Sequence, residues 1–293
     1  MRKWICGAAF FLGLAGTFLL LSPYLKEHAL GREQSKEIQR FEKETVREDS
    51  LSEETDPLYQ GMKDYNERIY AENQAGLTDA FSYEENEFDL SGLSPEGDLI
   101  GYLEIEKVDI KIPLYIGANE ENLSKGAAVL FQTSMPVGGE NTNCVIAGHR
   151  GYGGDRLFRD IEELEKGDLI NIRNPWGELR YLVTSCAVIQ PDELEAVKIV
   201  QGEDMITLCT CHPYGSNASR YVVYALREGT QTRTTGEGQE EYREHIESSE
   251  KRIRLEERMN AAALCISALV TALLGAAWIR DIIPKAFGKQ KEH

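Results

Sequence analysis

The chain has 293 residues, enough for one catalytic domain of ordinary size with flanking segments. Acidic residues outnumber basic ones by 49 to 32, and the net charge of -17 excludes nucleic-acid binding, which needs clustered positive charge. The six cysteines are not spaced like a small disulfide framework. A bridge between Cys144 and Cys186 is the one pairing that the spacing leaves open.

Two apolar segments predict a membrane helix at each end of the chain. Residues 4–21 carry no charge and are just long enough to span a bilayer. A cleaved signal peptide is the alternative, but the run is long for one and no clear small-x-small site follows, so an uncleaved anchor over 1–25 is favoured. A second uncharged run ends at an interfacial Trp278 and predicts a transmembrane helix over 260–280.

Charge bias sets the expected orientation of these helices. Arg2 and Lys3 precede the first helix, and basic flanks of a first helix stay in the cytoplasm. Two spans return the C-terminus to the cytoplasm, where residues 281–293 form a basic tail. We therefore expect a multi-pass protein of the cell membrane, with both termini cytoplasmic and the intervening residues extracellular.

Charged segments flank the central domain. Residues 26–96 are expected to begin as a solvated, partly helical stalk and to continue as a helix over 56–74. Asp56 is the candidate N-cap of that helix, and Pro57 suits its first position. Residues 229–259 are expected to form a charged connector that is helical from about 239. Apolar residues recur at helical spacing along residues 56–74 and form one face of the helix. They are Leu58, Met62, Tyr65 and Ile69.

Short apolar runs between 97 and 228 alternate with Gly, Pro and Asn, a pattern typical of strands and turns. One helix is expected, over 157–167, and the Asn-Pro-Trp-Gly sequence at 174–177 predicts a hairpin connection. Many short strands with one helix indicate a mainly β fold, a barrel or sandwich of about 130 residues. The predicted strands cover 99–105, 110–116, 143–148, 168–173, 178–189, 205–211 and 220–226.

A candidate nucleophile lies at the end of one of these strands. Side chains alternate along a strand, so Thr207, Cys209 and Cys211 share one face, and Leu208 and Thr210 lie on the other. A Pro-Tyr-Gly-Ser-Asn stretch ends the strand just after Cys211. A strand-end cysteine is rigidly held and can still reach solvent, which a nucleophile requires.

Two histidines inside the domain are candidates for the acid and base. An unperturbed thiol has a pKa of about 8.5, and a nearby imidazolium stabilises the thiolate and can later protonate a leaving amine. His149 ends an apolar run and opens a His-Arg-Gly turn. His212 is adjacent to Cys211, but neighbouring strand residues face opposite sides, so His212 should point away. His149 is therefore the predicted acid and base.

Arg220 opens the next strand, nine residues after Cys211. Attack on an amide carbonyl places negative charge on its oxygen, which a permanently charged guanidinium can hold. Each residue taken alone also fits a structural role, such as an inert buried cysteine or a solvated arginine at a strand edge. The functional interpretation rests on their combination.

Together these residues resemble the sortases of Gram-positive bacteria, specifically the class C or pilin-polymerising group. The family signature Thr-Leu-x-Thr-Cys is matched by Thr207, Leu208, Thr210 and Cys211, and Arg220 completes a Cys-x-Pro-x-Gly-x-Asn-x-x-Arg spacing. The segment that leads to the histidine also matches. The resemblance extends over roughly residues 56 to 226, and the two-anchor layout fits this class.

The resemblance implies an eight-stranded sortase β-barrel with short helices and a definite reaction. The Cys211 thiolate would cleave an LPXTG-like sorting signal of a surface or pilin protein after Thr, and a thioester would form. An amine, typically a pilin lysine, would resolve the thioester in pilus assembly. His149 would protonate the leaving amine and deprotonate the incoming one, and Arg220 would steady the oxyanion. No metal or organic cofactor is implied.

The class also carries an N-terminal lid with an Asp-Pro-aromatic motif. The corresponding stretch here is Leu-Thr-Asp-Ala-Phe, in which Asp79 would approach Arg220 and Phe81 would cover Cys211. Ala80 stands where proline is usual, and because proline stiffens a turn, a looser lid is expected. The alternative is a solvated linker that happens to contain these residues.

Four other functions stay open. A peptidoglycan precursor could replace the pilin lysine as acceptor, which would make the chain a cell-wall-anchoring enzyme. Water could replace the amine, which gives a plain cysteine hydrolase. A metal or redox module would use Cys209, Cys211 and His212, but C-x-C is not the usual C-x-x-C spacing and no second cluster completes four ligands. A membrane-tethered binding domain would make the whole site incidental.

Overall fold

The computed structural model divides the chain into two compact units, Met1–His28 with Glu250–His293 and Ala29–Ser249. Parts of the predicted stalk, lid segment, connector and basic tail lie outside the described residues. The structure describes residues 2–47, 55–83, 98–151, 157–229 and 239–286.

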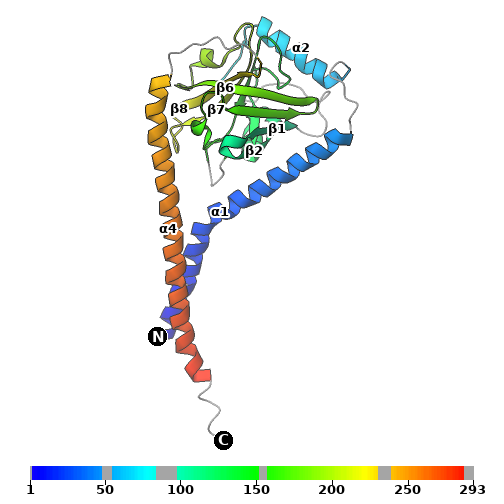
Figure 1. The fold of residues 1–293 in the computed structure, drawn as a ribbon. Helices are drawn as coiled ribbons and strands as arrows, with labels where there is room; N and C mark the ends of the chain where they lie inside the picture. The colour runs from blue at the N-terminus through cyan, green and yellow to red at the C-terminus, as the bar shows by residue number, and fades with distance from the viewer. Residues whose placement is uncertain (1, 48–54, 84–97, 152–156, 230–238, 287–293) are drawn as a thin grey trace. The chain divides into compact units, whose positions relative to one another are not determined.

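A closed eight-stranded barrel, in the order β1-β2-β3-β4-β7-β8-β6-β5, forms the body of the larger unit (Figure 1). The predicted mainly β fold is confirmed, and the predicted strands end within one residue of the observed ones. One strand, β3, was not predicted because three residues are too few to show alternation. The bounds are β1 (Leu99–Ile105), β2 (Ile110–Ile116), β3 (Ala127–Val129), β4 (Thr142–Ala147), β5 (Leu169–Asn174), β6 (Gly177–Ile189), β7 (Asp204–His212) and β8 (Ser219–Arg227).

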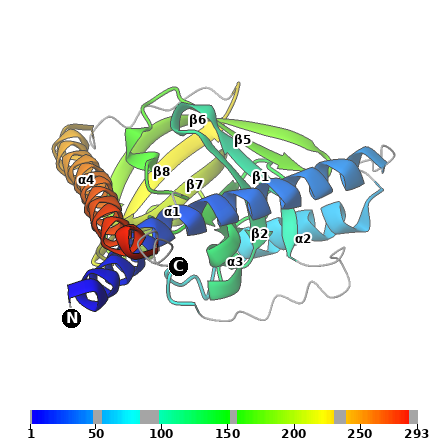
Figure 2. The same cartoon turned by 90° about the horizontal axis from the view of Figure 1, so that it is seen from below.

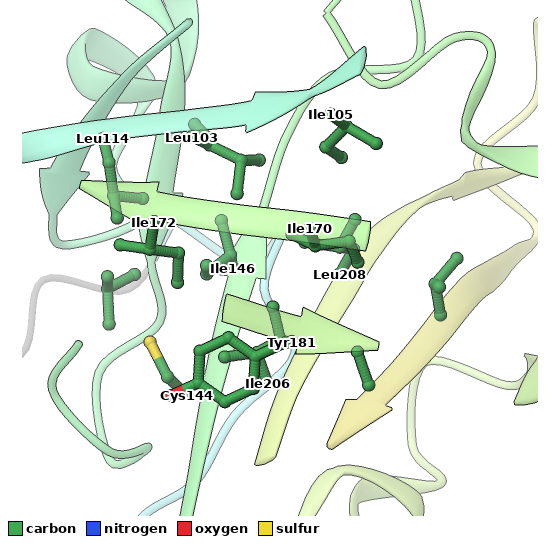
Figure 3. Close-up of a cluster of buried hydrophobic side chains, with 14 of the residues drawn as sticks. Leu103, Ile105, Leu114, Cys144, Ile146, Ile170, Ile172, Tyr181, Ile206 and Leu208 are labelled. Atoms are coloured by element: carbon green, nitrogen blue, oxygen red, sulfur yellow. The ribbon is translucent and has the colours of Figure 1, made fainter. Parts of the chain in front are cut away.

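Alternating side chains fill the inside of the barrel (Figure 3). The intervening residues of the same strands form a second cluster on the outer face, which contains Val145, Ala147, Cys209 and Val222. The partly buried Cys211 packs against this outer cluster. The interior side chains include Leu103, Ile105, Leu114, Ile146, Ile170, Ile172, Ile206 and Leu208.

The predicted 56–74 helix is confirmed as α2 (Pro57–Ala71), with Asp56 as its N-cap. Its predicted apolar face is buried against the barrel core. Asn66 exchanges two hydrogen bonds with the backbone of Met135, at 2.7 and 3.3 Å. Just past the helix, Gln74 bonds backbone groups of two barrel loops, at 2.9 and 2.7 Å. The chain is therefore held firmly on the barrel at the point where the lid segment begins.

The predicted stalk is helical as far as Arg47, but one stripe of it is packed on the barrel rather than solvated. From Ala29 onward, α1 (Arg2–Arg47) belongs to the same unit as the barrel and runs along it (Figure 2). Its side chains Gln34, Ile38 and Phe41 are buried. The ring of Phe41 lies edge-on to that of Tyr102 in β1, 6.1 Å between centroids. The sequence did not predict this packing, because the apolar stripe is narrow and the rest of the segment is charged. Such a pattern fits a packed helix and a solvated helix equally well.

The predicted helix over 157–167 is also wrong. Only Ile161–Glu163 is helical, as a single 3-10 turn. The Phe158 N–H bonds the carbonyl of His149 at 3.0 Å, so this segment follows a tertiary contact rather than its own helical pattern. A short helix that was not predicted, α3 (Glu120–Lys125), follows β2.

The smaller unit contains the predicted membrane helices. α1 and α4 (Gln239–Ala286) include the stretches Trp4–Thr45 and Ile253–Arg280, which by length and composition could cross a membrane. Within this unit the two helices are in contact, and Thr17 Oγ1 lies 2.8 Å from Ser267 Oγ. The helical connector expected from about 239 is confirmed and runs without a break into the apolar segment.

Candidate active site

Three neighbouring strands bring the predicted catalytic residues to one face of the barrel. β7 and β8 are antiparallel, and Cys211 lies directly opposite Arg220. β4 and β7 are parallel, with Ala147 beside Cys209 as the last pair. His149 comes two residues after Ala147, and Cys211 comes two residues after Cys209. Because side chains two residues apart lie on the same face, His149 and Cys211 are expected on the face of Ala147 and Cys209. Cys211 therefore lies between the strand that bears Arg220 and the strand that leads to His149.

Asn217 links Cys211 to Arg220. The half-buried Cys211 thiol donates to Asn217 Oδ1 at 3.2 Å, and the same oxygen accepts from Arg220 Nη1 at 2.9 Å. Asn217 is exposed, on the loop between β7 and β8. The sequence pattern contained it only as the Asn of the Cys-to-Arg spacing, with no role attached.

The segment after α2 lies against this face. Asp79 binds Arg220 at two points, with Arg220 Nε to Oδ1 at 2.7 Å and Nη2 to Oδ2 at 2.6 Å. The Phe81 ring lies 5.9 Å from the His149 ring, and the Arg220 guanidinium carbon lies 5.1 Å from the centre of the Phe81 ring. Ala80 is buried, so the absence of proline does not keep the segment away from the site.

The surroundings oppose the charged forms of Cys211 and His149. Burial raises the pKa of the Cys211 thiol, Arg220 opposes that rise, and Asp79 adds to it. Burial lowers the pKa of His149, and the Glu120 carboxylate opposes the fall. A thiol, an imidazole and a guanidinium on one face are the groups that acyl transfer uses.

His212 points to the other face, as predicted. Its Nδ1 lies 2.8 Å from Arg150 Nη1 and 2.9 Å from Glu162 Oε1, in a cluster buried inside the barrel. The sequence suggested no role for Arg150 or Glu162, because no short spacing connects them.

Cys209 lies on the same face as Cys211, and none of the six cysteines forms a disulfide. Cys144 and Cys186 therefore do not pair with each other. Cys209 is fully buried, and burial raises the pKa of its thiol. Within the described part of the chain, no group of three or more His, Cys, Asp or Glu side chains is arranged to hold a metal ion.

Comparisons with known proteins point to one family. The family model for the sortase domain matches residues 103–228. The chain is 30% identical to sortase D of Bacillus subtilis over 141 residues, which are 47% of this chain and 68% of that protein. Among solved structures, sortase C1 of GBS pilus island 1 is similar at 31% identity and a TM-score of 0.59, over 70% of this chain and 96% of that one. The sortase C of Clostridium perfringens, solved with the C-terminal cell wall sorting motif, is similar at 34% identity and a TM-score of 0.55, over 67% of this chain and 100% of that one.

Proposed function

This chain belongs to the sortase family of cysteine transpeptidases, and we propose that Cys211 is its nucleophile, His149 its general acid and base, and Arg220 the group that stabilises the oxyanion. The observation that supports this proposal most strongly is the register in which β4, β7 and β8 pair. Cys211 faces Arg220 across β7 and β8, and β4 leads to His149 on its other side.

The proposed reaction has two halves. In the first, Cys211 passes its thiol proton to His149, and Cys211 Sγ attacks the carbonyl carbon of the substrate threonine, whose oxygen takes up negative charge beside Arg220. The Thr–Gly amide bond then breaks, His149 gives its proton to the leaving amine, and a thioester forms. In the second half an incoming amine loses a proton to His149 and attacks the thioester. The thiolate leaves, and a new amide bond remains.

We propose an LPXTG-type sorting signal as the acyl donor and a pilin lysine as the acceptor. The likeness to class C structures supports both, including one from a pilus island and one solved with a sorting motif. Anchoring of proteins to peptidoglycan precursors is the alternative acceptor chemistry, and hydrolysis the alternative outcome.

Asp79 and Phe81 are proposed to act as a lid. The carboxylate of Asp79 occupies two nitrogens of the guanidinium that the oxyanion needs. The ring of Phe81 lies 5.9 Å from that of His149, at an angle of 35° between the ring planes. Substrate must displace both, so the closed arrangement is proposed to be the resting form of the enzyme.

Two membrane-capable helices, one toward each end, support anchoring in the cell membrane. We propose that both termini are cytoplasmic and that the barrel is extracellular, from the basic residues before the first helix. Proteolysis of intact cells tests this topology. External protease should remove the barrel and spare an epitope at the C-terminus; loss of that epitope would reverse the C-terminal assignment.

Product analysis tests the reaction. The full-length protein in detergent micelles is incubated with a library of LPXTG-like peptides, with and without a lysine-containing pilin peptide. A product cleaved after Thr and joined to the lysine amine supports transpeptidation and identifies the preferred motif. Cleavage without transfer favours hydrolysis, and transfer only to a peptidoglycan-type amine favours cell-wall anchoring.

A further inference from the structure

A buried polar network lies directly behind the site, on the inner face of the barrel. Arg150 follows His149 and His212 follows Cys211, so the neighbours of both reacting groups point inward. Arg150 Nη1 lies 2.8 Å from His212 Nδ1, and Arg150 Nη2 forms an ion pair with Glu162. The side chains of Arg150 and Glu162 are 3% and 4% exposed, and that of His212 is 5% exposed. The proposed reaction uses none of the three.

The pairing of β4 with β7 ends just before the reacting groups. At its end the Gly148 N–H donates to the Cys209 carbonyl at 3.1 Å. Beyond that bond, two side chains connect the strand ends. Thr210 Oγ1 donates to the Gly148 carbonyl at 2.7 Å, and Arg150 Nη1 donates to the Cys211 carbonyl at 3.2 Å. Arg150, the residue that follows the proposed base, thus binds the backbone of the proposed nucleophile.

We propose that Arg150 is a positioning residue for transpeptidation, whose guanidinium holds the ends of β4 and β7 together so that His149 stays beside Cys211. This inference rests on the proposed roles of those two residues. A planar guanidinium suits the task because its fixed donors reach a carbonyl, an imidazole and a carboxylate at once. Glu162 supplies the negative charge without which a buried cation would be costly.

The network is independent of the lid. Asp79 bonds Arg220 on the outer face, whereas Arg150 contacts His212, whose ring lies 6.0 Å from that of Tyr221 in the interior cluster. The segment that bears Glu162 is tied to the base as well, because the Phe158 N–H donates to the His149 carbonyl at 3.0 Å. These contacts can therefore persist when the lid opens, which is when the alignment of base and nucleophile matters.

A double-mutant cycle tests whether Arg150 acts through His149. The rate of Cys211 alkylation by iodoacetamide is measured by mass spectrometry on the full-length protein in micelles, in the lid-released Asp79→Asn background. His149→Ala and Arg150→Gln should each slow alkylation by about tenfold, the effect of one pKa unit on the thiolate fraction. The combined variant should be no slower than either one. Multiplicative effects, or a His149→Ala variant that reacts like its parent, would overturn the proposal.

A second variant separates positioning from folding. Arg150→Gln leaves the Glu162 carboxylate without its cation, which can unfold the chain. The Arg150→Gln/Glu162→Gln pair keeps the buried charge balanced and should retain the parental Tm. Its kcat for transfer should still fall, on the order of 100-fold, with KM unchanged, because a small misplacement of a catalytic group is enough. A folded double variant with parental kcat contradicts the proposal.

The two proposals fail in different ways. If the unmodified chain forms neither a thioester nor a transfer product, the proposed function fails, whereas the alkylation cycle still decides the role of Arg150. If the chain transfers normally but the cycle shows no coupling between Arg150 and His149, only the positioning role is lost.

Discussion

Arg220 and Asp79 form a two-point ion pair at 2.7 and 2.6 Å. The third guanidinium nitrogen, Nη1, donates to Asn217 Oδ1 at 2.9 Å. Every nitrogen of Arg220 is therefore engaged. A carboxylate on two of these nitrogens competes with an oxyanion for the guanidinium, so we expect the lid to depart before chemistry in the proposed mechanism.

Weakening this ion pair should activate the enzyme. Asp79→Asn keeps the size of the side chain and removes its charge. We expect the rates of Cys211 alkylation and of acyl transfer to rise on the order of tenfold. This factor corresponds to a loss of about 1.4 kcal/mol in the free energy that favours the closed lid. The neighbouring Thr78→Ala serves as the control and should leave both rates near those of the parent. Equal rates for Asp79→Asn and the parent would argue against an occluding lid.

The pH dependence of the thiol should change in the same variant. Burial penalises the charged thiolate, and so does the negative charge of Asp79, so both raise the pKa of Cys211. The parental alkylation profile should therefore have its midpoint above the ordinary thiol value of about 8.5. In Asp79→Asn the midpoint should move to lower pH. A midpoint that stays fixed or rises would show that the carboxylate does not act on the thiol.

The two domain histidines should differ sharply. His149→Ala should abolish transfer, because the proposed reaction loses its proton donor. His212→Ala should cost far less activity, since His212 points away from the thiol into the Arg150 and Glu162 network. Initial rates normalised to folded protein make the comparison. The reverse order of activities would mean that His212 is the acid and base.

Asn66 should matter for stability rather than for chemistry. Asn66→Ala leaves the N–H and carbonyl of Met135 without their side-chain partner. We expect a loss of about 2 kcal/mol in the free energy of unfolding, the usual cost of buried polar groups left unpaired. Lys63→Ala, on the exposed side of α2, is the matched control. Equal unfolding midpoints for the two variants would contradict this role of Asn66.

Local patterns predicted the parts of this protein that depend on local rules. Alternation placed Cys211 and His212 on opposite faces, and capping with helical spacing predicted α2. Contacts between segments that are distant in the sequence could not be predicted from local patterns. The burial of Phe41 depends on where Tyr102 lies, and the helical pattern at 157–167 yields to a bond with the His149 carbonyl.

The same limit applies to the site. Motif spacing identified Cys211 and Arg220, because the two lie on adjacent strands joined by a short loop. The network of Arg150, Glu162 and His212 assembles from three separate segments. A single sequence contains no spacing that brings these segments together, so the network emerges only from the fold.

The most direct test of the central claim is to trap the acyl-enzyme. The full-length protein in micelles is mixed with one LPXTG peptide without an amine, and the intact mass and the modified peptide are measured. We predict an adduct with the mass of the peptide through its Thr, attached at Cys211, absent from Cys211→Ala and released as an amide when an amine is added. An adduct that persists in Cys211→Ala, or one that maps to another residue, would contradict the account.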